Sequence, residues 1–508
     1  MSAADLPARV NEFVQWLFAD YRPSIPKGPK VFNDALLGNQ YFASHEVAII
    51  DSPLLQRLKR IRQTGLVYQV FPSARHSRFE HSLGVVTLAE RCFNAIQDRA
   101  SLEDVSLEVN NDRYRGDLAH LRMAALLHDA GHGLCSHASE QISEYSSDLR
   151  EFKRNPQFIK NAPGEIISHL ITKSPFFREW FDGVANSARP KATIDLDLVA
   201  EMILGRHRDP EKFFLAQIVS SPYDADKLDY IARDSFYCGL ALTVDLPRFY
   251  SMIAVTKYED KRILVLRSYV PLEQILFSKM TLYSAVYHHQ KVKCLDHMLR
   301  SLVQHIIENP GQCSVPVVGK TVTFADPVQY LYVTDEEFFN QHGGFGDQFV
   351  KSMLNRFARR DLFVRCVEVS RRTVKNWAHY GRKRLVDLSK DFEGLAAVEN
   401  EIHKRLPPDI RSECSAGEAI LSVPPPPGMA TDNAFIQVAK DSAPESVAEF
   451  FPVEQWVEAY SHNKWRAFVY SPKKYAKAVR DAAVSVLADE EFRIEVRDEV
   501  SNEACHLE

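Results

Sequence analysis

An adjacent histidine and aspartate, His128 and Asp129, follow an apolar run at residues 121–127 that is typical of a helix. Such a pair presents one imidazole nitrogen and one carboxylate oxygen, and divalent transition metals accept both ligand types. Gly131 comes two residues later and lets the backbone turn tightly. We therefore interpret His128 and Asp129 as metal ligands. Two residues cannot complete such a site, so we expect further nitrogen and oxygen donors from distant parts of the chain.

Two other stretches contain candidate partners for this pair. An Arg-Phe-Glu-His sequence supplies His81 at a predicted helix start, and an Asp-Lys-Leu-Asp sequence supplies Asp226. A single histidine in an apolar helix is most often a packed core residue, and a bare His-Asp pair is weak evidence for a metal. Here, however, Gly131-His132 and Ser136-His137 follow the pair directly. Chance assembly of all these motifs is improbable.

Together these motifs resemble those of the HD-domain deoxynucleoside triphosphate (dNTP) triphosphohydrolases. The likeness extends to bacterial dGTP triphosphohydrolases and, more closely, to vertebrate enzymes that carry a sterile alpha motif before the HD domain. It covers most of the chain and implies a mainly α fold, with an HD-domain helical phosphohydrolase core and a C-terminal α+β region. The metal implied is a divalent transition ion such as iron or manganese, with magnesium accompanying the nucleotide. The implied metal ligands are His81, His128, Asp129 and Asp226.

The reaction implied by this resemblance is hydrolysis at the α-phosphorus, which yields a deoxynucleoside and tripolyphosphate. It requires an activated water, positive charge for the phosphates and an acid for the departing 5′ oxygen. His137 and Glu140 are three residues apart on a predicted helix, so the carboxylate can orient and charge the imidazole as that acid. His132 is expected to contact the reacting phosphate. Taken alone, the His137 and Glu140 spacing also fits an ordinary surface pair.

The resemblance carries further substrate roles onto matching positions. The residues expected near the phosphates are Arg78, Lys227, Tyr230 and Lys279. Those expected near the sugar are Gln63, Asp234 and Tyr287. A tyrosine packed near C2′ would crowd out a ribose hydroxyl and so select deoxynucleotides. Simpler structural interpretations exist, because Asp234 can form an ion pair with Arg233 and Tyr287 has the spacing of a packed core residue.

The sequence departs from the family pattern in two places. The family usually has a His-Glu pair after the His137 segment, whereas residues 161–165 here are Asn-Ala-Pro-Gly-Glu. His169, one turn further on, is either a substitute or a packed or surface histidine. Lys279 stands where the vertebrate enzymes have arginine, which gives a point charge in place of a bidentate fork.

The resemblance also implies activation by a nucleotide bound at a subunit interface, with a guanine nucleotide as the candidate effector. The positions that match part of this pattern are Lys30, Val31, Asp51, Gln56 and Lys59. Asp51 is the base-reading carboxylate of the pattern, although Asp51-Ser52-Pro53 also suits a helix start. A homo-oligomer, dimer or tetramer, is expected on the same ground.

The elements that must position these residues are mostly helical between residues 52 and 307. The spacing predicts one long helix over 272–307, which would place Lys279 and Tyr287 about two turns apart on one face, and a strand over 261–266. Further on, we predict strands at 317–324, 363–369, 419–423 and 435–439, a charged helix at 382–395 and a proline-rich break at 424–428. The expected domains are an N-terminal helical segment (1–27), an HD-domain core (28–310) and a C-terminal α+β region (311–508) for oligomerisation or regulation.

Composition places the chain among folded globular proteins, with 45% apolar and 25% charged residues. The formal net charge of −5 gives no global basic field, which argues against a protein dedicated to coating nucleic acid. A local basic groove would not show in this sum, so weak single-stranded binding stays open. The eight cysteines have no C-x-x-C pair and are expected to be reduced thiols. No apolar run reaches about 18 residues, so we expect a cytoplasmic protein without a membrane segment.

Three functions remain open from the sequence alone. The leading one is a metal-dependent dNTP triphosphohydrolase in nucleotide-pool control or phage defence. The second is an HD-domain nuclease or phosphodiesterase that acts on single-stranded or cyclic nucleotides. The third is a catalytically weak oligomer that senses nucleotides or binds nucleic acid, because the family's second histidine is missing.

Overall fold

The computed structural model describes residues 5–144, 146–242, 244–341, 347–375, 377, 379–389, 391–425, 434–450, 455–456 and 464–497. The chain forms two compact units, and each unit is built from three separate segments. Unit 1 comprises Met1–Leu282, Ala325–Phe338 and Ala430–Pro452, and unit 2 comprises Tyr283–Phe324, Phe339–Met429 and Val453–Glu508. The domain boundaries expected at residues 27 and 310 stay predictions.

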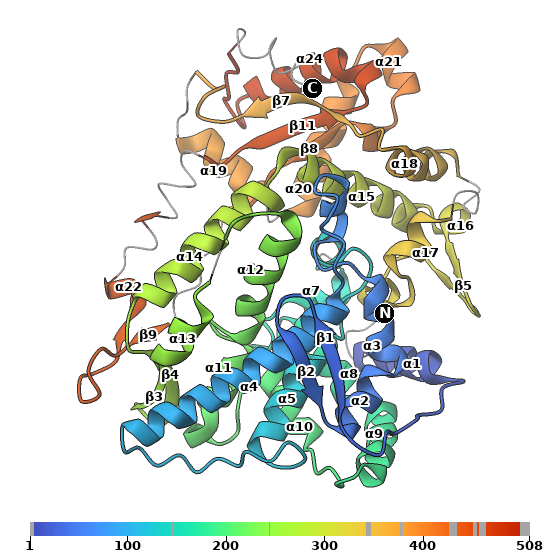
Figure 1. Cartoon of the computed structure of the whole chain (residues 1–508). Coiled ribbons are helices and arrows are strands. Elements are labelled where there is room, and N and C mark those ends of the chain that lie inside the picture. The colour runs from blue at the N-terminus through green and yellow to red at the C-terminus, as the bar shows by residue number, and fades with distance from the viewer. Residues whose placement is uncertain are drawn as a thin grey trace. The chain divides into compact units, whose positions relative to one another are not determined.

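Unit 1 is mainly helical. Its α-helices are α1 (Leu6–Phe18), α2 (Ser44–Ile50), α3 (Pro53–Gln56), α4 (Arg78–Leu102), α5 (Asp117–Leu127), α6 (His137–Ser143), α7 (Ser147–Phe152), α8 (Pro163–Lys173), α9 (Pro175–Ser187), α10 (Leu196–Ile203), α11 (Phe213–Val219), α12 (Ala225–Cys238), α13 (Leu246–Met252), α14 (Val270–Leu282), α17 (Asp335–Phe339) and α22 (Val447–Phe450). Its short 3-10 helices are η2 (Arg57–Arg60), η3 (Gly65–Gln69), η4 (Pro210–Lys212) and η6 (Pro327–Tyr332). Helix α4 packs against both α5 and α12 in this unit (Figure 1).

Polar side chains fix the starts of the two helices that matter most for the site. At α4, the Glu80 carboxylate accepts the Ser77 backbone N–H at 2.9 Å, and Ser77 in turn caps the helix. At α12, the Asp224 carboxylate accepts the Lys227 backbone N–H at 2.8 Å. These caps set where each first turn begins, and the first turns carry the candidate donors His81 and Asp226.

Small sheets complete unit 1. Strands β1 (Lys30–Asp34) and β2 (Gly38–Phe42) form an antiparallel hairpin. A second sheet has the order β10-β9-β4-β3, with β3 (Ile253–Tyr258) and β4 (Lys261–Leu266) antiparallel, β9 (Phe435–Ile436) parallel to β4, and β10 (Glu445–Ser446) antiparallel to β9. The strand predicted at 261–266 is therefore confirmed.

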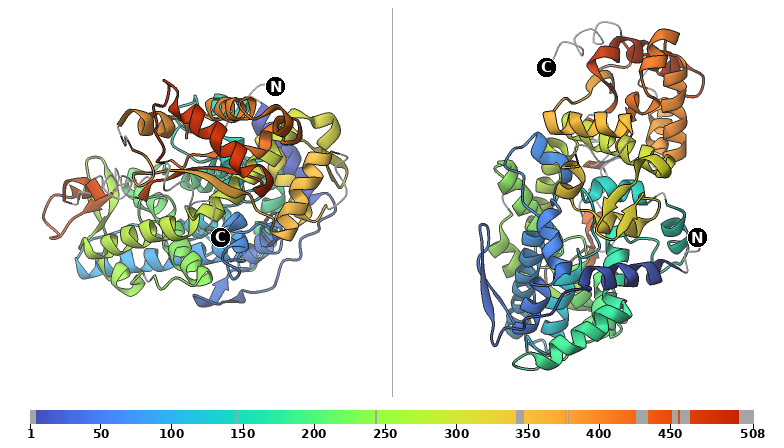
Figure 2. Two further views of the ribbon diagram at one scale, coloured as in Figure 1. Left: turned by 90° about the horizontal axis from the view of Figure 1, so that it is seen from above. Right: turned by 90° about the vertical axis from the view of Figure 1, so that its right-hand side faces the viewer.

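Unit 2 has an α+β construction. Its helices are α15 (Gln290–Glu308), α16 (Pro310–Cys313), α18 (Gln348–Arg359), α19 (His379–Leu388), α20 (Phe392–Lys404), α21 (Pro408–Glu413), α24 (Ala476–Ala488) and the short turns η5 (Tyr283–Tyr287), η7 (Ala416–Glu418) and η8 (Lys473–Tyr475). An antiparallel sheet has the order β7 (Val364–Val369), β11 (Ala467–Ser471), β8 (Ile420–Ser422), and β5 (Val315–Val317) pairs with β6 (Lys320–Val322). Helix α24 packs on β7 and β11 around an apolar core (Figure 2). The expected fold class, a helical core with a C-terminal α+β region, is confirmed.

Three predicted elements are wrong in extent. The long helix expected over 272–307 is interrupted, because Tyr283–Tyr287 form a π-helical turn and His289 then caps α15 by accepting the Lys291 backbone N–H. The strand expected over 317–324 is a hairpin, since Gly319 has a φ of 71° and reverses the chain between β5 and β6. The charged helix expected over 382–395 is split between α19 and α20.

The other strand predictions hold in shortened form. The predicted segments 363–369, 419–423 and 435–439 contain β7, β8 and β9, respectively. Pro426, Pro427 and Gly428 of the predicted proline-rich break lie outside the described residues. Among the described cysteines, all are free thiols, as expected. Within the described part of the chain, no helix is long and apolar enough to cross a membrane.

Candidate metal-dependent active site

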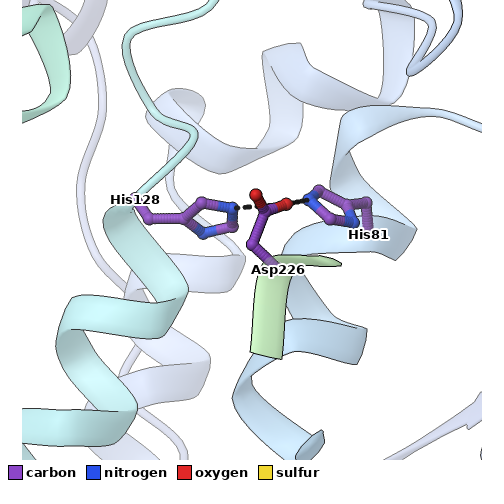
Figure 3. A group of neighbouring side chains, drawn as sticks. All are labelled: His81, His128 and Asp226. Atoms are coloured by element: carbon purple, nitrogen blue, oxygen red, sulfur yellow. Dashed lines mark ion pairs between the residues drawn. The ribbon is translucent and has the colours of Figure 1, made fainter. Parts of the chain in front are cut away.

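Four side chains from three helical segments of unit 1 face one another. His81 lies in the first turns of α4, His128 and Asp129 follow the last residue of α5, and Asp226 lies in the first turn of α12. The Oδ1 atom of Asp226 is 3.0 Å from His81 Nε2 and 3.9 Å from His128 Nε2 (Figure 3). Asp129 lies 3.4 Å from His128 Nε2 and 3.5 Å from His81 Nε2. The structure thus brings together all the metal ligands predicted from the sequence.

The two histidines each present one nitrogen to this space. The Nδ1 atom of His128 donates to the Ala125 carbonyl at 2.7 Å, and Nδ1 of His81 pairs with Asp229 at 2.8 Å. Their Nε2 atoms are buried, and each faces the carboxylates of Asp129 and Asp226. Occupied Nδ1 atoms fix each ring so that Nε2 points to the common centre, as second partners of metal-binding histidines do. These nitrogens and two carboxylates fit a divalent transition metal such as iron or manganese.

The charge around this cluster also favours a cation. Burial would lower the pKa of His81, but its contacts with Asp226 and Asp229 raise that pKa to about 10. Burial would likewise raise the pKa of Asp129, yet Arg78, followed by His128, holds it well below its usual value. Both aspartates of the cluster are therefore ionised, and their field stabilises positive charge at the centre.

Asp229 is a supporting residue to which the sequence analysis assigned no role. Its Oδ2 atom accepts from Arg233 Nε at 2.7 Å as well as pairing with His81. Arg233 also donates to Asp34 at 2.8 Å, so the expected alternative of an Arg233–Asp234 ion pair is not what the structure shows. A Cβ atom at Gly84 of α4 would overlap the Asp229 carboxylate. The spacing of Asp229, three residues after Asp226 on one helix, was the available signal.

A second cluster, His132, His137 and Glu140, lies beside the first. Nδ1 of His137 donates to Glu140 Oε2 at 2.7 Å, as the helical spacing predicts. His132 lies between the clusters, with Nε2 3.1 Å from Asp129 and Nδ1 3.2 Å from Glu140. Burial would raise the pKa of Glu140, but His132 and His137 lower it well below its usual value. The His137 side chain is 69% exposed, so a substrate can reach it.

An unusual turn aims His137. Cys135 and Ser136, just before α6, have φ values of 53° and 51°, a region that side-chain-bearing residues adopt rarely. The Asp335 carboxylate holds this turn by accepting the Cys135 N–H at 2.7 Å and the Arg62 N–H at 2.9 Å. Strain of this kind persists only where the surroundings fix it, and it is concentrated at functional sites. Asp335 is therefore another residue of the site that the sequence analysis missed.

Close approach of α8 explains the glycine in the Gly131-His132 motif. Gly131 donates its N–H to Ser168 Oγ at 2.8 Å, and a Cβ atom there would lie 2.5 Å from the Ser168 nitrogen. The chain turns at residues 128–131, as expected from the sequence. The φ of Gly131 is not positive, so the close approach of α8 is the reason for a glycine at this position. At the same contact, Gly164 donates its N–H to Glu140 Oε1 at 2.8 Å.

Comparisons with known proteins agree with this geometry. Residues 78–233 match the HD domain family, and residues 245–496 match the family described as the HD associated region. The deoxynucleoside triphosphate triphosphohydrolase SAMHD1 of Gallus gallus is 26% identical over 424 residues, covering 78% of this chain and 63% of that protein. The SAMHD1 homolog of Dictyostelium discoideum is 29% identical over 277 residues, covering 54% of this chain and 48% of that protein. The two matches together cover most of the chain, which belongs to the HD-domain family and is similar to its dNTP triphosphohydrolases.

Two further relatives match more of their own length. An uncharacterized protein of Methanocaldococcus jannaschii is 26% identical over 459 residues, covering 89% of this chain and 81% of that protein. A solved structure of a hypothetical protein from Aquifex aeolicus has a TM-score of 0.58 at 20% identity, covering 89% of this chain and 99% of that chain. That likeness concerns the fold alone. The matched region spans about half to two thirds of the length of the two triphosphohydrolases named above.

The phosphate-binding positions expected from this family form a cationic group in unit 1. Arg78 donates to Asp129 at 2.6 Å, to Ser136 Oγ at 2.9 Å and to His137 Nε2 at 3.2 Å. Lys227 donates to Asp224 at 2.8 Å, and its pKa is raised because Asp224 and Asp226 outweigh burial. Burial, and then the nearby Lys227, lowers the pKa of Lys279 to about 8. Tyr230 lies one turn after Lys227 on α12.

The family's sugar-binding positions lie in different surroundings. Asp234 is buried and pairs with His76 Nε2 at 2.7 Å. Gln63 is also buried, and its Oε1 atom has no hydrogen-bond partner among the described residues. Tyr287 is half-buried in the π-helical turn of unit 2 and packs edge-on against Tyr283. Because the helix over 272–307 is broken there, Lys279 and Tyr287 do not share one helical face, contrary to the sequence expectation.

His169 has a packed environment. It is 4% exposed, its Nδ1 atom donates to the Ala200 carbonyl of α10 at 2.8 Å, and burial lowers its pKa. His169 is therefore a packed histidine, which is one of the alternatives that the sequence left open.

The family's activator positions form two local groups in unit 1. Lys30 of β1 pairs with Asp51 at 3.1 Å, and both side chains are substantially exposed, as is the neighbouring Val31. Gln56 donates to the Ile50 carbonyl at 2.8 Å, and the Lys59 ammonium lies 4.5 Å from the centre of the Phe79 ring. Ser52 is the N-cap of α3, so the helix start expected at Asp51-Ser52-Pro53 is present as well.

Proposed function

We propose that this chain hydrolyses deoxynucleoside triphosphates at the α-phosphorus and releases a deoxynucleoside and tripolyphosphate. The observation that carries the proposal is the convergence of two buried histidine nitrogens and two carboxylates beside the His137–Glu140 pair. The names of the SAMHD1 relatives support the same reaction. A local phosphohydrolase site alone would leave the substrate open, and the family likeness narrows it to dNTPs.

Each group of the site has a part in this reaction. A divalent metal held by His81, His128, Asp129 and Asp226 would supply Lewis acidity and lower the pKa of a water. His137 is assigned as the acid for the departing 5′ oxygen, with Nδ1 held by the ionised Glu140. Its Nε2 atom accepts from Arg78 in this structure, so Arg78 would turn to the phosphate when Nε2 carries the proton.

The remaining residues bind and position the substrate. His132, fixed between Asp129 and Glu140, contacts the phosphate under attack. Lys227, Lys279, Tyr230 and Arg78 hold the triphosphate, and magnesium accompanies the nucleotide. Arg78 already donates to three protein groups, so it orients Asp129 and His137 in addition to any phosphate contact.

The finer parts of the proposal concern selection and regulation. Tyr287 is assigned to exclude a ribose 2′-hydroxyl, with Gln63 and Asp234 toward the sugar. Lys30, Val31, Asp51, Gln56 and Lys59 are assigned to a guanine-nucleotide activator in a homo-oligomer. Free thiols at the described cysteines support a cytoplasmic setting, where the enzyme would control dNTP pools or limit phage replication.

The decisive experiment identifies products. Purified protein loaded with Mn²⁺ or Fe²⁺ and supplied with Mg²⁺ is incubated with each dNTP, each NTP, a cyclic dinucleotide and short single-stranded DNA. Deoxynucleoside and tripolyphosphate from dNTPs, absent with His128→Ala, support the proposal. Nucleotides released from DNA or from the cyclic substrate would instead assign the nuclease or phosphodiesterase alternative. Nucleotide binding without any product would assign the sensing alternative.

A further inference from the structure

A third group of metal-binding side chains lies in unit 2 and has no part in the proposed reaction. It consists of His305 near the end of α15, Cys313 at the end of α16 and Asp347 at the N-cap of α18. One nitrogen, one sulfur and one carboxylate oxygen from these residues all lie within 4.8 Å of one another. Three separate segments of the chain therefore bring their donor atoms to one point.

Each of the three donors is held in place. The Asp347 carboxylate accepts the Val350 N–H at 3.0 Å as the cap of α18, which fixes its position. The His305 ring packs on Phe349 with 4.6 Å between ring centres. Cys313 is fully buried. Ligands that are already ordered lose little conformational entropy when an ion binds, which favours binding.

The histidine nitrogen in this group is buried and faces the carboxylate. Nε2 of His305 lies 3.2 Å from Asp347 Oδ1. A cation bound here would be held by the nitrogen, the carboxylate and the thiol together. The side chains of His305 and Asp347 are 28% and 17% exposed, which leaves an open side for an ion to enter.

We propose that His305, Cys313 and Asp347 form a second metal site, distinct from the HD centre, that binds a zinc-type transition ion. Sulfur and imidazole ligands select zinc and similar metals, whereas Mg²⁺ and Ca²⁺ prefer oxygen ligands. Three protein ligands leave a fourth tetrahedral position for water. The ion would tie α15, α16 and α18 together within unit 2.

Cobalt substitution tests this site without reference to activity. Metal-free protein is titrated with Co²⁺, and the near-ultraviolet sulfur-to-cobalt charge-transfer band is followed. The proposed HD centre contains only nitrogen and oxygen donors, so this band reports a cysteine ligand alone. We expect the band in the wild type and in His128→Ala, and we expect it to be lost in Cys313→Ser. His305→Gln and Asp347→Asn should weaken cobalt binding at least about tenfold.

Controls keep the result decisive. Cys414→Ser removes another buried thiol of unit 2 that belongs to none of the described metal-binding groups, and it should leave the band unchanged. Zinc content by mass spectrometry should fall by one ion per chain in Cys313→Ser and stay constant in Cys414→Ser. The proposal is overturned if saturated wild-type protein shows no band. It is equally overturned if the band persists in Cys313→Ser or disappears in Cys414→Ser.

Discussion

At the residue scale, the proposed metal centre has four protein ligands, and loss of any one of them should be felt. His128→Ala and Asp129→Ala each remove one of four protein ligands, so each should abolish turnover and reduce bound metal. Metal analysis and rate measurement on the same samples check this. Full metal content with wild-type rates in both variants would remove these residues from the site.

The two histidines on either side of the missing family histidine are predicted to behave differently. His137→Ala should lower kcat by about 10²–10⁴-fold, because His137 alone is partnered by a carboxylate and exposed. His169→Ala should change stability more than rate, since its ring is buried and bonded to Ala200. Steady-state kinetics and thermal melting of both variants separate these effects. A large loss of rate confined to His169→Ala would identify His169 as the acid.

We predict that loss of the Lys279 charge lowers the activity of the proposed enzyme at alkaline pH. Its pKa of about 8 means that the side chain loses its charge as the pH rises through 8, and with it the attraction for phosphate. In the free enzyme this appears in kcat/KM, which should fall up to about tenfold per pH unit above pH 8. Lys279→Arg keeps its charge in this range, so its profile should stay level to higher pH. Superimposable pH profiles for the two proteins would contradict this role.

At the scale of elements, Asp335 holds the turn that precedes α6 and orients His137. Asp335→Ala leaves the Arg62 and Cys135 N–H groups without an acceptor in a buried place, which should destabilise unit 1 by about 1–3 kcal/mol for each group. Because this turn aims His137, kcat should fall more than KM rises. Denaturant unfolding and kinetics check both effects.

Asp335→Asn is the matched control, because its side-chain oxygen can still accept one of the two N–H groups. It should therefore retain more stability and more turnover than Asp335→Ala. Equal turnover in the wild type and both variants would show that the turn does not position the acid.

The π-helical turn at Tyr283–Tyr287 has a consequence for substrate selection. A continuous helix would have fixed the separation of Lys279 and Tyr287, whereas the interruption makes the position of Tyr287 depend on unit 2. If Tyr287 excludes the ribose hydroxyl, as proposed, that role does not come from a helical face shared with Lys279.

At the scale of the whole molecule, the proposed activator site predicts that rate and assembly change together. A guanine nucleotide should raise dNTP turnover and shift the protein to a larger oligomer. Asp51→Ala should reduce the ratio of activated to unactivated turnover, because it removes the carboxylate that pairs with Lys30 and is assigned to read the base. Rates and light scattering at several nucleotide concentrations test this.

Glu413→Ala is the control for this prediction. It also removes the carboxylate of an exposed ion pair, with Lys474, but from unit 2. A reduced response to nucleotide in both variants would point to a general effect of surface charge instead of a site at Asp51.

The sequence by itself determined the helical class and the metal-binding motifs, because apolar spacing and adjacent His-Asp residues are local properties of the chain. The helical spacing of His137 and Glu140 predicted their contact for the same reason. Tertiary structure decided the rest. Asp335 reaches the Cys135 turn from 200 residues away, so no local pattern marks it. The spacing of Asp229 from Asp226 is local, but its contact with His81 of another helix is not. The grouping of His305, Cys313 and Asp347 likewise arises only when three separate segments pack together.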